Sequence, residues 1–136
     1  MTHKIILALI SIFLITATSC GPVKDCDEKG NEFYKYLKNK DFEHIDQYLD
    51  PEAIENTPIE IWKKGLEKKN ADYGMILNVE RRDFETHTSD NVTRVAIKYK
   101  VTYTKCTMYE RLEFIERNAD YKITYYGFDE DSTMVN

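Results

Sequence analysis

Apolar residues in the first half of the chain recur at helical spacing, which predicts helices before any strand. Residues 25–39 place Phe33, Tyr36 and Leu37 on one helical face with charges between them. A second short helix is expected after Asp41, ending at Asp50-Pro51. Its apolar stripe, at i, i+3, i+6 and i+7, consists of Phe42, Ile45, Tyr48 and Leu49.

The segment Thr57-Pro58-Ile59-Glu60 has the sequence of a capping box with proline at the first helical position, and it predicts a third helix. Its core face is expected to carry Ile59, Trp62 and Leu66. Basic residues late in this helix suit the negative end of the helix dipole and are expected to form a solvated rim. They are Lys63, Lys64, Lys68 and Lys69.

After Gly74 the hydrophobic period changes from near 3.6 to two, which predicts strands over residues 75–86, 92–105, 107–117 and 121–128. The inner face of the second strand is expected to carry Val95, Ile97, Tyr99, Val101 and Tyr103. That of the third carries Met108, Leu112 and Phe114. The strand carboxylates, Glu110 among them, are expected mostly in solvent. Short connections at 89–91 and 118–120 require antiparallel pairing.

Three helices followed by four antiparallel strands predict an α+β domain with the helices packed on one face of a curved sheet. This order resembles the nuclear transport factor two-like superfamily, also called the cystatin-like cone fold. Two short helices over residues 31–49, a helix bearing Trp62 and long strands carry the resemblance. It implies a domain over residues 26–128 and a pocket enclosed by the sheet and helices. The polar residues 129–136 are expected to form a tail after this domain. Enzymes of this superfamily, such as ketosteroid isomerases and scytalone dehydratases, place Asp, His and Tyr in that pocket.

A signal sequence is predicted at the N-terminus, because Lys4 precedes an apolar run over residues 5–15. As a helix this run spans roughly 16 Å, against about 30 Å for the hydrocarbon core of a bilayer. The small residues that follow, ending in Cys20, resemble the lipobox of bacterial lipoproteins. The resemblance implies removal of residues 1–19, acylation of Cys20, a tether over residues 20–25 and anchoring in the bacterial cell envelope, at the outer membrane or cell surface. The alternative is an ordinary secretory signal cut near Ala17.

Composition and charge narrow the class of partner. The 136 residues carry a net charge of −5, and without residues 1–19 there are 18 basic against 24 acidic residues, a net charge of −6. No block of five lysines or arginines occurs, which argues against sequence-independent nucleic-acid binding. The outer sheet face is expected to be charged, which favours a monomer or a weak dimer. Its residues are Arg94, Lys98, Lys100, Arg111, Glu113 and Arg117.

Two cysteines remain once Cys20 carries lipid. Cys26 and Cys106 are an even pair in a compartment that permits disulfides, so a bridge between them is one hypothesis. Two independent reduced thiols are the other. No His, Cys or carboxylate cluster has the spacing of metal ligands, and no cofactor is expected.

Candidate pocket residues are mostly aromatic, because phenols and indoles offer an apolar body with a polar tip. They are Tyr36, His44, Trp62, Tyr99, Tyr103, Phe114 and Tyr125. The leading hypothesis is a non-enzymatic binding module for a small ligand or an envelope protein. The alternative is an envelope enzyme of the isomerase, dehydratase or hydrolase type, using His44 and pocket tyrosines. A purely structural or assembly module is a third possibility.

Overall fold

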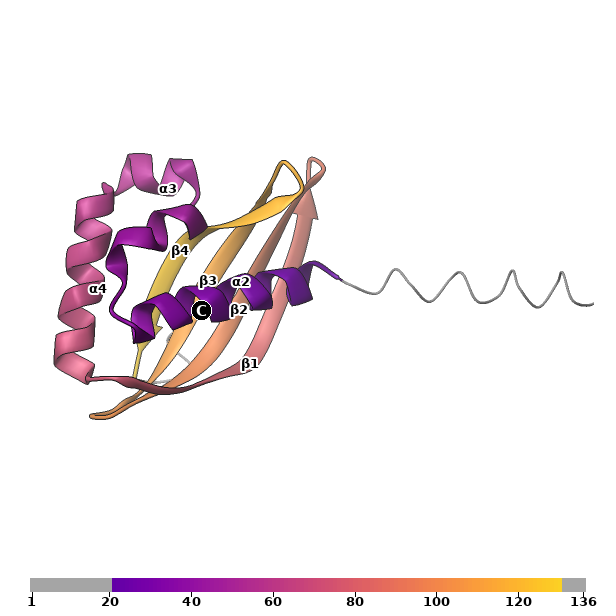
Figure 1. The fold of residues 1–136 in the computed structure, drawn as a ribbon. Coiled ribbons are helices and arrows are strands. Elements are labelled where there is room, and N and C mark those ends of the chain that lie inside the picture. The colour runs from indigo at the N-terminus through magenta and orange to yellow at the C-terminus, as the bar shows by residue number, and fades with distance from the viewer. Residues whose placement is uncertain (1–20, 131–136) are drawn as a thin grey trace, which may run out of the picture.

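The computed structural model describes residues 21–130, which form helices followed by a four-stranded antiparallel sheet (Figure 1). The predicted α+β class is therefore confirmed. The elements are α2 (Pro22–Lys38), the 3-10 helix η1 (Phe42–Tyr48), α3 (Pro51–Asn56), α4 (Ile59–Tyr73), β1 (Ile76–Ser89), β2 (Val92–Tyr103), β3 (Thr107–Arg117) and β4 (Asp120–Asp129).

The strands lie in chain order, β1-β2-β3-β4, and every neighbouring pair is antiparallel. Two-residue turns join β1 to β2 and β3 to β4, and all four turn residues have positive φ: Asp90, Asn91, Asn118 and Ala119. This left-handed conformation gives the turn a twist that matches the strands. Both predicted hairpin turns are confirmed, and β1 and β4 are the two edges of the sheet.

The first two helices differ from the prediction in position and type. α2 begins at Pro22, so most of the expected tether over residues 20–25 is helical. Proline suits this first position because its missing N–H has no partner there in any helix. The second helix is a 3-10 helix, and its buried residues Phe42, Ile45 and Tyr48 fit that form because they are spaced by three. Its predicted apolar stripe is confirmed.

The connection to α4 also differs. Pro51 was expected to end a helix, but it opens the short α3 instead. Thr57 caps the C-terminal end of α3, where its N–H donates to Ala53 O at 3.0 Å. α4 therefore starts at Ile59 with Pro58 as its N-cap and no side-chain cap. The predicted capping box is wrong, because Thr57 is already used by the preceding helix.

All the helices lie on one side of the sheet (Figure 1). α2 crosses the inner face and contacts β1, β2 and β4. Gly30 permits this approach, since a Cβ there would lie 2.4 Å from Tyr99 Oη. The core between α2 and the sheet contains Phe33, Leu37, Ile97 and many other buried apolar side chains.

Among the described residues, no helix is long and apolar enough to cross a membrane. The predicted signal sequence and Cys20 lie outside the described residues, as do residues 131–136 of the predicted tail.

Candidate functional site

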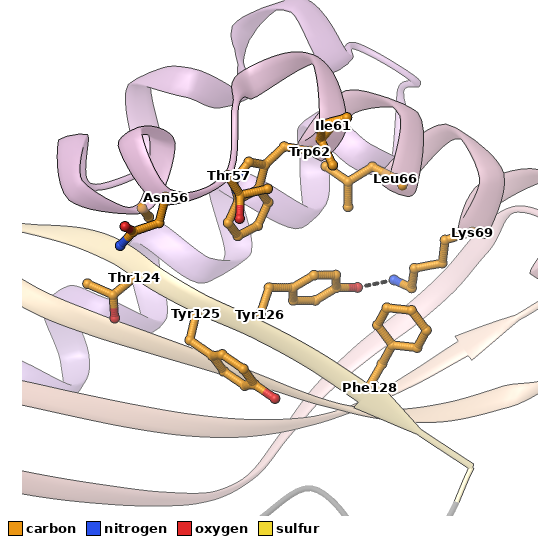
Figure 2. Close-up of a pocket in the computed structure, with 12 residues that line it drawn as sticks. Asn56, Thr57, Ile61, Trp62, Leu66, Lys69, Thr124, Tyr125, Tyr126 and Phe128 are labelled. Carbon is orange, nitrogen blue, oxygen red and sulfur yellow. Dashed lines mark hydrogen bonds between the residues drawn. The ribbon is translucent and has the colours of Figure 1, made fainter.

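A pocket of about 400 Å³ opens between α4 and the edge strand β4. It exists because α4 packs mainly against η1, which leaves space between α4 and β4. Figure 2 shows Trp62 and Leu66 pointing from α4 toward β4. The lining residues are Ala53, Asn56, Thr57, Ile61, Trp62, Gly65, Leu66, Lys69, Thr124, Tyr125, Tyr126 and Phe128.

The mouth of the pocket is apolar and exposed. Ile61, Tyr125 and Phe128 are 56%, 49% and 44% exposed. Gly65 borders the pocket, and a Cβ there would meet no atom within 4 Å. The indole Nε1 of Trp62 is buried without a hydrogen-bond partner in the described part of the chain.

A buried ion pair lies at the inner end of this pocket. Lys69 Nζ is 2.9 Å from Glu110 Oε1, and the two side chains are 4% and 0% exposed. Lys69 also donates to the hydroxyls of Tyr103 and Tyr126, the latter drawn in Figure 2. The three protons of the ammonium are therefore all used by protein acceptors.

Glu110 is correspondingly saturated. Besides Lys69, its carboxylate accepts hydrogen bonds from Tyr34 at 3.1 Å, from Tyr103 at 2.5 Å and from Tyr126. Burial, followed by the nearby Glu110 charge, raises the pKa of all three phenols above the ordinary tyrosine value. Burial lowers the pKa of Lys69, while Glu110 opposes that shift. The cluster is thus a closed network that holds its protons.

Both charged members of this network were expected in solvent, and both expectations are wrong. Glu110 alternates with Met108 and Leu112 on β3, so period two places it on the inner face. Lys69 lies three residues after Leu66 on the core side of α4. The signal was present in the spacing, but charged side chains are rarely buried unless paired, and the pair is distant in sequence.

The predicted pocket residues separate into three places. Trp62 and Tyr125 line the pocket. Tyr103 lies behind the lining and accepts a hydrogen bond from the lining residue Lys69. Tyr99 and Phe114 belong to the packed core instead, each 1% exposed. The Tyr99 hydroxyl donates to Asp27 on α2 at 2.9 Å, which fixes the side chain beneath that helix.

Tyr36 and His44 lie elsewhere. Tyr36 lines a separate groove with Tyr48 and Asp41. The His44 side chain is 67% exposed and its Nδ1 lies 2.8 Å from Asp41 Oδ1. His44 was a candidate pocket residue, but the faces of a 3-10 helix repeat every three residues, and the buried face of η1 consists of Phe42, Ile45 and Tyr48. His44 is therefore outside the pocket.

The two cysteines do not approach one another. Both are free thiols in the structure, Cys26 buried in α2 and Cys106 half-buried. Burial, with Asp25 and Asp120 adding to the effect, raises the pKa of Cys26 to about 12. Asp120 starts β4, whereas Cys106 lies in the β2–β3 connection at the other end of the sheet. The structure therefore contains no disulfide between Cys26 and Cys106.

In the described part of the chain, no group of three or more His, Cys, Asp or Glu side chains could hold a metal ion. On the outer sheet face, Arg111 pairs with Glu113 at 2.9 Å and with Glu85 at 3.7 Å.

The chain matches no protein-family model, and a search of curated proteins finds no significant similarity.

Proposed function

We propose that this protein is a lipid-anchored, non-enzymatic binding protein of the bacterial cell envelope, and that its pocket between α4 and β4 takes a small, largely apolar ligand. The observation that carries the proposal is the pocket itself. Its volume of about 400 Å³ falls in the usual range of small-molecule sites. Aromatic and aliphatic side chains from α4 and β4 line it, with a few uncharged polar groups from Asn56 and Thr57.

A binding role is favoured over catalysis because the acid–base groups near the pocket are committed to one another. General acid–base catalysis needs a group that can exchange a proton with the substrate. Lys69, Glu110 and Tyr126 are bound within one network. His44, on which the enzymatic alternative depends, is exposed and bonded to Asp41.

The proposed anchor is compatible with access to the pocket. α2 begins at Pro22 on the side of the domain opposite α4 (Figure 1). A lipid on Cys20, two residues before Pro22, would leave the α4–β4 side clear of the bilayer surface. Several acyl chains, at about 0.8 kcal/mol per buried CH₂, would make such an anchor effectively permanent.

The pocket is tested by filling it. The neutral fluorophore N-phenyl-1-naphthylamine serves as the probe, and Gly65→Phe places a phenyl ring in open space beside the pocket. Gly65→Ala is the matched control, since one methyl group leaves the pocket open. We expect Gly65→Phe to weaken probe binding at least about tenfold, corresponding to 1.4 kcal/mol, and Gly65→Ala to retain it. Equal binding by both variants would contradict the proposal.

The anchor is tested separately by labelling cells with radioactive palmitate. The wild-type protein should incorporate the label and remain in the membrane fraction. Cys20→Ala should lose the label. Equal labelling of the two proteins would refute lipidation at Cys20.

A further inference from the structure

We infer that the ligand of the α4–β4 pocket is uncharged, an inference that rests on the proposed binding function and specifies its ligand class. Among the described residues that line the pocket, Lys69 is the only ionisable one whose ordinary state at neutral pH is charged. It is compensated by Glu110 at 2.9 Å. The pair has no net charge, whichever of the two groups holds the proton.

At the inner end of the pocket, the Lys69 ammonium has no free proton to donate to an anionic ligand. The protons of Lys69 are taken by Glu110, Tyr103 and Tyr126. For a ligand carboxylate to gain one, Lys69 would have to give up a buried partner. A buried charge without a partner is costly, so such an exchange would add little to the binding free energy.

A cationic ligand meets the opposite difficulty. Aromatic faces can bind cations, but Lys69 already holds this position, with Nζ 4.8 Å from the Tyr126 ring centroid and 5.4 Å from that of Phe128. A second cation there would be repelled. Glu110 is completely buried and accepts four hydrogen bonds, so it offers no anionic contact.

What the pocket does offer suits a neutral, ring-containing molecule. Trp62, Tyr125 and Phe128 provide aromatic surface, and Ile61 and Leu66 provide aliphatic surface. At the α3 end, the side chains of Asn56 and Thr57 supply uncharged hydrogen-bonding groups. Together these groups favour a compact apolar body with an amide, carbonyl or hydroxyl substituent over its charged analogues.

The test compares ligands that share one ring and differ in charge. Wild-type protein loaded with N-phenyl-1-naphthylamine is titrated with 1-naphthaleneacetamide, with 1-naphthaleneacetate, or with 2-(1-naphthyl)ethylammonium. We expect the amide to displace the probe at a concentration at least about tenfold lower than either charged compound needs, because desolvating an unpaired charge exceeds 1.4 kcal/mol. Displacement by either charged compound as readily as by the amide would overturn the inference.

A variant gives a second, independent readout. Glu110→Gln keeps the side-chain shape and removes the charge that compensates Lys69. We expect the ratio of carboxylate to amide affinity to rise at least about tenfold in this variant and to return in Lys69→Met/Glu110→Gln. An unchanged ratio in folded Glu110→Gln would overturn the inference, and the wild-type titration decides if this variant does not fold.

Failure of this inference and failure of the proposed function are distinguishable. A charged compound that displaces the probe at least as well as the amide, with displacement lost in Gly65→Phe, would overturn only the ligand class. Absence of any Gly65-sensitive probe binding would overturn the binding function and this inference together.

Discussion

Replacing Lys69 with methionine should destabilise the domain far more than removing an ordinary lysine. The substitution keeps much of the side-chain length and apolar contact but leaves Glu110 buried without its cation. Lys69 and Glu110 are 4% and 0% exposed and 2.9 Å apart, so solvent cannot replace the lost partner. Breaking a buried pair on one side costs about 3–5 kcal/mol.

The lower end of this range is expected here, about 3 kcal/mol, because Glu110 retains phenol donors from Tyr34, Tyr103 and Tyr126. A loss of this size is a large part of the 5–15 kcal/mol that typically stabilises a domain. The neighbouring Lys68→Met is the matched control. The Lys68 side chain is 77% exposed, so its removal should change stability by no more than about 0.5 kcal/mol.

Urea unfolding provides the measurement. The single tryptophan, Trp62, lies on α4 near the cluster and reports by fluorescence, while far-UV circular dichroism reports the whole domain. The double variant Lys69→Met/Glu110→Gln should lose at least about 2 kcal/mol less than the sum of the two single variants. The reasoning is refuted if Lys69→Met falls within about 1 kcal/mol of Lys68→Met, since the pair would then behave as a solvated one.

Three further predictions concern pH, cysteine reactivity and turn conformation. Stability should fall above pH 10, because the buried phenols, whose pKa is raised, keep their protons in the folded domain while the unfolded chain releases them. Each such phenol lowers the free energy of unfolding by about 1.4 kcal/mol per pH unit. Within the cluster, only Lys69, whose pKa is lowered, opposes this loss, and it does so up to pH 10.5. The phenols concerned are Tyr34, Tyr99 and Tyr103. Tyrosinate absorbance should therefore rise together with loss of circular dichroism, and full ionisation of a folded domain would contradict this. In the native protein, iodoacetamide should label Cys106 faster than the buried Cys26, and peptide mapping would measure both rates. Equal rates would be inconsistent with the fold, and so would two cysteines that react only after a reductant is added. Ala119→Gly should stabilise the β3–β4 turn by roughly 0.5–1 kcal/mol in urea unfolding, because Ala119 has a φ of 62°; a destabilisation would count against that conformation.

The sheet could be predicted from sequence because its signals are local. Alternation along β2 placed Val95, Ile97 and Val101 on the buried face, and all three are there. Turn residues at 89–91 and 118–120 fixed two of the hairpins, and short connections left only antiparallel pairing. Each of these inferences uses residues a few positions apart.

The pocket could be predicted only in part, because it depends on the distance at which separate helices and strands pack against one another. Trp62 and Tyr125 were expected to line a pocket, and both do. Their facing positions arise from the path of α3 and α4 beside β4, which no local pattern contains. His44 was also a candidate pocket residue, but the 3-10 conformation of η1 puts Phe42, Ile45 and Tyr48 on the buried face and leaves His44 in solvent.

The Lys69–Glu110 pair shows a different limit. Periodicity alone puts both residues on inner faces, yet a lone buried charge is so unfavourable that either residue, read by itself, is expected in water. Only the tertiary contact between α4 and β3, 41 residues apart in the chain, makes both burials compatible.

The central claim, that the α4–β4 pocket is the binding site, is tested most directly by mapping where a ligand binds. Amide chemical shifts of the ¹⁵N-labelled protein would be recorded during titration with 1-naphthaleneacetamide. We expect saturable shift changes concentrated at residues 61–69 of α4 and 124–128 of β4, absent in Gly65→Phe and present in Gly65→Ala. Changes confined to the groove at Tyr36 and Asp41, or to the outer sheet face, would contradict the account.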